Sequence, residues 1–214
     1  LPNEPYKLTM ALTGLRLPPA WDRKDIATFD FFDLKGVVEG LLEQLHVQGV
    51  QYVPAIHPSY HPGKCAEVRV GDTVLGVMGE LHPLVKANYN FAASPILAAE
   101  FDLQVLLSVA ADRFEASGVI TFPPVLEDIA VILDETVSAA QVEALIRQTG
   151  GKLLVGLRLF DVFRGEQIGS GKKSLAYKMT YQAADRTLTD KDAAQIRGRI
   201  VRRLEQELGA KLRS

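Results

Sequence analysis

Residues 159–181, LFDVFRGEQIGSGKKSLAYKMTY, predict two β-strands that meet at a charged, glycine-rich turn. Outward from this hairpin, strand patterns lie at 128–133 and 210–213. One helix is predicted to begin at Ser138, where Ser138 and Gln141 form a capping box, and another follows Thr189. The resulting order β-α-β-β-α-β predicts a ferredoxin-like sandwich with both helices on one face of the sheet. The other face stays open, and open sheets of this kind commonly bind RNA.

Alternation of side chains predicts which residues lie on that open face. In the strand at 175–181 the apolar residues alternate with small and polar ones, which therefore point outward. The preceding strand changes phase at Leu159 and Phe160, and this predicts a β-bulge that turns Asp161 and Phe163 to the open face. The predicted open-face set is Ala130, Asp161, Phe163, Ser174, Ala176, Lys178 and Arg213.

This set has the chemistry of a nucleic-acid site. A ring can stack on a base, a carboxylate can accept from a base edge, and cations can hold phosphate. The alternative is that Phe163 only covers a strand end and Asp161 only starts a turn. A run of arginines on the last helix is either a second RNA contact or a solvated helix face; it comprises Arg197, Arg199, Arg202 and Arg203.

The first half of the chain predicts a second antiparallel module. Its elements are expected to be a strand at 8–15, a helix at 33–45 capped by Asp33, a strand at 50–53, a proline- and histidine-rich loop at 57–63, a hairpin at 66–70 and 74–78, and a strand at 97–103 before a short helix. A polar segment at 108–121 separates the halves, which places the domains at 1–120 and 121–214. The fold class is therefore α+β.

The composition is typical of a globular protein with two domains. The chain has 214 residues, 47% of them apolar, which suffices for two cores. A single cysteine, Cys65, fits a reducing, cytoplasmic environment, and neither a membrane span nor a leader is expected. Because the chain opens at Leu1, close to a strand pattern, we expect it to be a fragment of a longer polypeptide. Residues 121–214 carry 15 Lys and Arg against 12 Asp and Glu, a mild basic excess that suits a nucleic-acid partner.

The second half resembles the ferredoxin-fold anticodon-binding domain of the bacterial phenylalanyl-tRNA synthetase β-subunit family. The runs that carry the likeness are 122–124 (FPP), 128–131 (DIAV), 159–165 (LFDVFRG), 171–176 (GKKSLA) and 186–190 (RTLTD). The first half resembles the catalytic-like, class II synthetase-like module of the same family. There the matching runs are 29–36 (FDFFDLKG), 57–64 (HPSYHPGK) and 76–83 (GVMGELHP).

The resemblance implies a non-catalytic part of an enzyme. In this family two α and two β chains join phenylalanine to its tRNA with ATP and Mg²⁺, and the active site lies in the α chain. We therefore expect no catalytic residue, no metal and no cofactor in this chain itself. The segment 98–103 (AAEFDL) agrees, since a class II site has there a glycine-rich strand that leads to an ATP-binding arginine, and this chain has no arginine until Arg113. The implied partners are the α chain and the anticodon stem-loop of tRNA(Phe), without a membrane.

The resemblance also places the anticodon contacts on Ala130, Asp161, Phe163 and Arg213, with Lys178 added from the strand pattern. Two positions depart from the family. Phe163 stands where tyrosine is frequent, so a hydroxyl contact is lost while stacking survives. Glu127 stands where arginine is frequent, so a phosphate contact would be absent or reversed in sign.

Three other patterns in the sequence could indicate a ligand site. Zinc could be held by His57, His61, Cys65 and His82, although their spacing lacks a metal-ligand signature and His-Pro turns explain the histidines. Mg²⁺ could be held by Asp22, Asp25, Asp30 and Asp33, although a loop and a helix cap explain them. The glycine-rich segment 169–174 joins two strands, unlike a phosphate loop. As functions, a metabolite-sensing βαββαβ module and a purely structural interface module remain alternatives.

Overall fold

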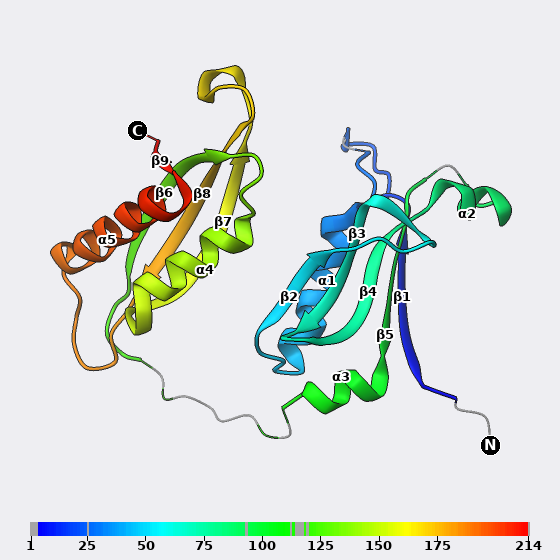
Figure 1. Ribbon diagram of the computed structural model, residues 1–214, viewed down its shortest axis with the longest axis horizontal. Helices are drawn as coiled ribbons and strands as arrows, with labels where there is room; N and C mark the ends of the chain where they lie inside the picture. The colour runs from blue at the N-terminus through cyan, green and yellow to red at the C-terminus, as the bar shows by residue number, and fades with distance from the viewer. Residues whose placement is uncertain are drawn as a thin grey trace. The chain divides into compact units, whose positions relative to one another are not determined.

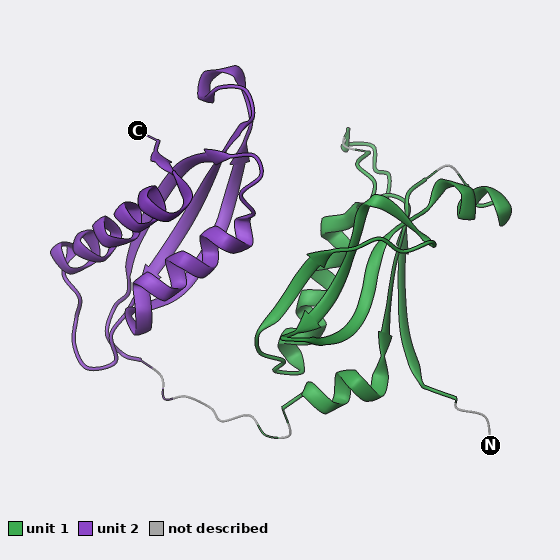
Figure 2. Ribbon diagram, viewed as in Figure 1, with its two compact units in different colours: residues 1–116 green, residues 117–214 purple. Residues whose placement is uncertain are grey.

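The computed structural model describes residues 4–24, 26–92, 94–111, 113, 118 and 120–213 (Figure 1). The chain forms two compact units, unit 1 (Leu1–Ala116) and unit 2 (Ser117–Ser214), shown in Figure 2. The sequence placed the boundary between 120 and 121, within a segment that lies partly outside the described residues. None of the described helices is long and apolar enough to cross a membrane.

Unit 1 is a five-stranded antiparallel sheet whose core is closed by its first and third helices. Its strands run in the order β1-β5-β4-β3-β2. They are β1 (Lys7–Thr13), β2 (Val50–Pro54), β3 (Tyr60–Val70), β4 (Thr73–Leu81) and β5 (Ile96–Asp102), with helices α1 (Phe31–Gln44), α2 (Pro83–Asn88) and α3 (Leu103–Val109). The core forms where the apolar stripe of α1 (Leu34, Val38 and Leu42) meets the inner residues of the sheet.

The structure corrects two details of unit 1. Asp33 does not cap α1: the N-cap is Asp30, whose carboxylate accepts from the amides of Phe32 and Asp33, and Asp33 bonds back to the Asp30 amide at 2.7 Å. The sequence offered two aspartates three residues apart, and the capping box uses both. The loop predicted at 57–63 is also shorter than expected, because β3 begins at Tyr60 and reaches its regular pairing after a register shift before Cys65.

Unit 2 has the predicted β-α-β-β-α-β order. Its elements are β6 (Val125–Asp134), α4 (Ala139–Gly150), the 3₁₀ turn η1 (Gly151–Leu153), β7 (Leu154–Phe163), the 3₁₀ turn η2 (Glu166–Ile168), β8 (Lys172–Tyr181), α5 (Asp190–Leu208) and β9 (Lys211–Leu212). The strands pair antiparallel in the order β7-β8-β6-β9, and α4 and α5 lie side by side on one face (Figure 1). The ferredoxin-like sandwich is therefore confirmed.

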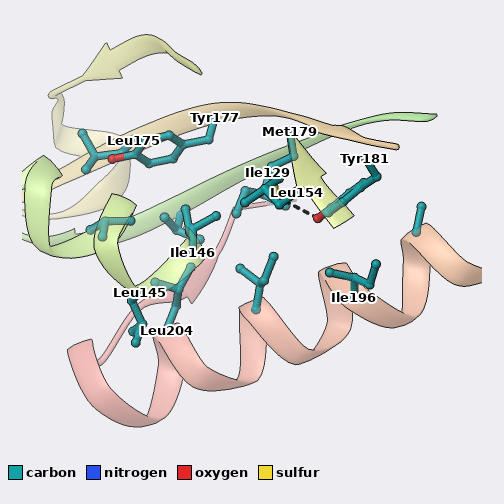
Figure 3. Packing of buried hydrophobic residues seen from close by; sticks show 14 of the residues in the cluster. Ile129, Leu145, Ile146, Leu154, Leu175, Tyr177, Met179, Tyr181, Ile196 and Leu204 are labelled. Atoms are coloured by element: carbon teal, nitrogen blue, oxygen red, sulfur yellow. Dashed lines mark hydrogen bonds between the residues drawn. The ribbon is translucent and has the colours of Figure 1, made fainter. Parts of the chain in front are cut away.

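The core of unit 2 fills the space between these helices and the sheet (Figure 3). Ile129, Tyr177 and Tyr181 point from the strands toward the helices and are almost fully buried. The predicted capping box of α4 is present, with Ser138 accepting from the Gln141 amide, and α5 ends at Gly209 in the left-handed conformation. These packed helices leave the opposite face of the sheet without a helical cover among the described residues.

Candidate nucleic-acid interface

Strand pairing arranges the open face of unit 2 as rows of neighbouring side chains. Ala130 on β6, Ala176 on β8 and Asp161 on β7 lie opposite one another in a single row. The next row holds Ile132, Ser174 and Phe163. Residues directly opposite in an antiparallel sheet share a face with Cβ atoms about 5 Å apart. The structure thus brings an acceptor, a ring and a floor of small side chains into one patch.

A β-bulge creates this arrangement. Leu159 lies opposite Tyr177, which faces the helices, whereas Asp161 lies opposite Ala176 on the open face. The register shifts between these two pairs, so Phe160 is the extra residue. The bulge predicted from the change of phase at Leu159 and Phe160 is confirmed, and it places Asp161 and Phe163 on the predicted face.

Arg213 joins the patch from the other edge of the sheet. Its backbone amide donates to the Ala130 carbonyl at 2.8 Å, which continues the β6–β9 pairing by one residue. Its guanidinium carbon lies 4.8 Å from the centroid of the Phe163 ring, a cation–π contact. Four of the five predicted residues, Ala130, Asp161, Phe163 and Arg213, therefore lie together.

Lys178 lies in the row beyond. It is exposed, two residues along β8 from Ala176, and it pairs with Asp128 on one side and Arg158 on the other. Same-face residues in a strand are about 7 Å apart. Lys178 and Arg158 therefore extend the patch with two cations and one carboxylate, and sequence reasoning had not included Arg158.

The turn that carries Phe163 is tied down by a residue that the sequence did not reveal. Glu135 accepts from Arg164 at Nη2 (2.7 Å) and Nε (3.2 Å), and its backbone carbonyl accepts from Lys173 Nζ at 2.8 Å. The bond from Arg164 holds the pKa of Glu135 below its usual value. A Cβ at Gly165 would lie 2.8 Å from Cζ of Phe163, so glycine is needed there for the ring to take this position.

Glu127 lies on the opposite face from the patch. It pairs with buried Met179 across the strands and lies 3.7 Å from Arg197 of α5. Of the two expected outcomes at this position, a phosphate contact that is absent or one reversed in sign, this orientation fits the first, because strand alternation turns the side chain toward the helices. Arg197 therefore does not share a helix face with the rest of the predicted arginine run. At about 100° per residue it lies about 120° or more around the helix axis from Arg199, Arg202 and Arg203.

The histidines and acidic residues of unit 1 have local partners. The Nδ1 atoms of His57, His61 and His82 each accept the amide two residues on, across a proline that has no amide hydrogen of its own. Arg16 bonds both Asp30 and Asp33, while Asp25 lies outside the described residues. Within the described ranges no three His, Cys, Asp or Glu side chains are placed to hold a metal ion.

Unit 1 carries a different kind of surface. Several of its large apolar side chains are mostly exposed, namely Tyr6, Trp21, Ile26, Phe32, Ile56 and Tyr89. On the sheet face away from α1, Glu100 and Glu67 flank Val77 in one row of the sheet. A hollow of about 240 Å³ lies there, with these two carboxylates, Asp102, Lys7 and His57 among its lining residues.

Comparison with known proteins matches each half separately. Residues 121–213 match the family described as the ferredoxin-fold anticodon binding domain, and residues 1–103 match the phenylalanyl tRNA synthetase beta chain CLM domain. The phenylalanine–tRNA ligase beta subunit of Symbiobacterium thermophilum is 41% identical over all 214 residues of this chain, which cover 24% of that protein. The corresponding subunit of Clostridium acetobutylicum is 42% identical over 185 residues, 86% of this chain and 23% of that protein.

The chain thus spans about a quarter of the length of the curated relatives it matches. Among solved structures, pyrrolysyl-tRNA synthetase from Desulfitobacterium hafniense covers 51% of this chain and the chain covers 43% of it, at 15% identity and a TM-score of 0.33. A likeness at that level carries no argument about either unit.

Proposed function

Because the chain belongs to the family of phenylalanine–tRNA ligase β subunits, we propose that unit 2 binds the anticodon of tRNA(Phe) on its open sheet face. The whole enzyme would use ATP and Mg²⁺ to join phenylalanine to this tRNA in the cytoplasm. This chain would contribute recognition and no chemistry.

The observation that carries the proposal is the row of Ala130, Ala176 and Asp161 beside the ring of Phe163. The small side chains of this floor would let a flat base lie close to the sheet. Asp161 is exposed and can accept from a base edge, and Phe163 offers a surface for stacking. Lys178 and Arg158 in the adjoining row supply the charge that a phosphate backbone requires.

For unit 1 we propose a class II-like module that docks on the α chain and does not bind ATP. Glu100 and Glu67 flank the middle of its free sheet face, and two carboxylates there would repel a triphosphate. The exposed apolar side chains, Trp21 and Ile56 above all, give unit 1 a surface suited to a protein partner. In the α2β2 assembly of the family, that partner would be the α chain.

Two alternatives differ from this proposal in where their ligands lie. A metabolite-sensing βαββαβ module usually binds at the loops between helices and strands, whereas the distinctive residues here lie on the sheet and the β7–β8 turn. A purely structural module needs no RNA contact at all. The match of residues 121–213 to an anticodon-binding family favours the tRNA assignment over both.

Binding of the 214-residue chain to a tRNA(Phe) anticodon stem-loop, beside one with a scrambled anticodon, tests the proposal over a salt series. We expect a preference for the true anticodon that survives as salt weakens both affinities. Asp161→Ala and Phe163→Ala should each reduce the preference about tenfold, since a stacked base or a good base-edge contact is worth on the order of 1–3 kcal/mol.

Matched controls lie close by. Phe160→Ala removes the same side chain from the bulge, and Asp185→Ala removes an exposed carboxylate from the loop after β8. Both should leave the preference intact. Equal binding to both stem-loops would reduce the patch to a basic surface, and an absence of binding would favour the structural alternative.

A further inference from the structure

The ring of Phe163 and the guanidinium of Arg213 come from opposite edges of the sheet and meet over its open face. β7 and β9 are the two outer strands of the order β7-β8-β6-β9. Strands lie about 4.8 Å apart, so the two backbones are separated by roughly 14 Å. A guanidinium carbon 4.8 Å from the ring centroid therefore means that the side chains span the width of β8 and β6.

The floor between them is buried although no described helix covers it. Ser174 is 2% exposed and Ala176 is 9% exposed, yet both lie on the face opposite α4 and α5. Phe163 lies directly opposite Ser174, and Arg213 bonds through its backbone to Ala130, which lies opposite Ala176. The side chains of Phe163 and Arg213 thus cover the small residues over which a base would bind.

The two partners are held very differently. The Phe163 ring packs on Gly165, and the adjacent Arg164 is bonded to Glu135 through two nitrogens. Arg213 follows a strand of two residues, and among the described residues its guanidinium makes no hydrogen bond or ion pair, only the cation–π contact with the ring. The ring is therefore the fixed partner and the guanidinium is the one that can leave.

We propose that Arg213 is a gate: in the free chain its guanidinium occupies the face of Phe163 on which a nucleobase stacks, and RNA binding exchanges the one for the other. This inference rests on the proposed function. A guanidinium and a base are both flat groups that bind an aromatic face, so they compete for it. Once displaced, Arg213 keeps its charge at the rim of the site, where a phosphate of the same RNA can take it up.

The exchange can be followed on Arg213 directly. In the free chain the ring current of Phe163 should shift the side-chain proton resonances of Arg213 upfield, and Phe163→Leu should abolish that shift. Saturation with the anticodon stem-loop should move these resonances back toward the values of an unstacked arginine. A shift that persists in the bound chain would overturn the gate while leaving the binding function intact, and a free chain without the shift would overturn it as well. A chain that does not bind the stem-loop would overturn both.

A rate measurement separates a gate from a simple phosphate contact. Arg213→Lys retains the charge but stacks less well than the planar guanidinium. We expect its association rate constant for the stem-loop to rise about two- to fivefold, the range that a cation–π contact represents, with an unchanged salt dependence. An association rate equal to or below that of the parent chain would overturn the gate, and Lys211→Arg, beside the site on β9, is the control for charge at this edge.

Discussion

Unit 1 and unit 2 bury their cores equally well but differ in what they leave exposed. In unit 1, α1 packs Leu34 and Val38 against the sheet without any exposure, and in unit 2, α5 does the same with Leu204. Yet Trp21 and Ile56 of unit 1 are 100% and 90% exposed, whereas the most exposed large apolar residue among those described in unit 2 is Leu126 at 59%. Burial of the core is therefore the same in both units and does not indicate what each unit binds. The side chains left exposed on the surface are the better guide to a binding partner.

The two units also differ in the side chains on the sheet face that carries no helix. Unit 1 presents Glu100 and Glu67, which disfavour a phosphate ligand. Unit 2 presents a ring, the carboxylates of Asp161 and Asp128, and several cations around a floor of small residues. Two antiparallel sheets with helices on one side thus offer different chemistry on their free faces because a few side chains differ.

The largest effect is expected from a substitution at Gly76, which should disrupt the fold of unit 1 and leave unit 2 folded. A Cβ at Gly76 of β4 would lie 2.2 Å from the Glu100 carbonyl oxygen and 2.9 Å from the Phe101 Cα, both backbone atoms that cannot move aside. Gly76→Ala should cost about 3 kcal/mol or more of folding free energy, because it forces β4 from β5. Amide hydrogen exchange should show protection lost in β4 and β5 and retained in β6 and β8.

Gly36→Ala is the matched control. Gly36 lies in the same unit, within α1, and a Cβ there meets nothing within 4 Å. Alanine is the better helix former, so this variant should gain roughly 0.5–1 kcal/mol. Loss of protection in both units of Gly76→Ala would show that their stabilities are coupled, and the comparison of two self-sufficient cores would then fail.

The sequence predicted unit 2 more completely than unit 1, for reasons visible in particular residues. Strict alternation along 175–181 and the phase change at Leu159 determine which face each side chain takes, so the bulge and the patch could be foreseen. In unit 1 the predicted cap, Asp33, and the observed one, Asp30, are the same residue type, and only the observed hydrogen bonds assign their roles. The short helix α2 was missed because only its proline marks it in the sequence.

Two long-range side-chain contacts of unit 2 were beyond prediction. Glu135 and Arg164 are 29 residues apart, and no local pattern links them. The sequence placed Phe163 and Arg213 in one patch, but their direct contact depends on side chains reaching across the sheet. The turn of Glu127 away from the patch follows from alternation with Ile129 and Val131, so this orientation could have been predicted and was not.

An intermediate effect is expected at the exposed apolar surface of unit 1. Trp21 makes its whole side chain available to a partner, and tryptophan is prominent among residues that dominate interfaces. Trp21→Ala should leave the stability of the chain within about 0.5 kcal/mol, since the side chain is fully exposed. It should weaken binding of the full β subunit to the α chain about tenfold, measured by titration calorimetry.

Leu126→Ala is the control from unit 2, because Leu126 is the most exposed of its described large apolar side chains and lies on the RNA-binding face as proposed. Its affinity for the α chain should match that of the parent subunit. Equal losses in the two variants would mean that the exposed surface of unit 1 has no special role in docking.

The smallest expected effect is a difference between α4 and α5 in how the stability of their first turns depends on pH, because their capping boxes differ in charge. The N3 amides of α4 and α5 are held alike, each donating to a hydroxyl at 3.2 Å: Gln141 to Ser138 and Asp192 to Thr189. The return bond is donated by the backbone amide of the N-cap residue, and it is accepted by the uncharged side-chain amide of Gln141 in α4 and by the carboxylate of Asp192 in α5. Hydrogen bonds from Thr189 lower the pKa of Asp192, with smaller contributions from Arg186 and Lys191.

Because this folded-state pKa lies below the unfolded one, the carboxylate stabilises α5 fully above about pH 4, and that contribution is lost as the pH falls through the lowered pKa. The exchange protection of the Asp192 amide, corrected for intrinsic rates, should therefore fall several-fold at acid pH while that of Gln141 holds. Asp192→Gln, which copies the α4 cap, should remove the pH dependence. Unit 1 supplies a parallel case: the capping box of α1 includes Asp33 as its N3 residue, and the Asp30 amide and Arg16 lower the pKa of this carboxyl, so the first turn of α1 should loosen in acid together with that of α5. If instead the Gln141 amide lost protection in parallel, acid would be acting on the whole of unit 2 and the local cap would not be the cause.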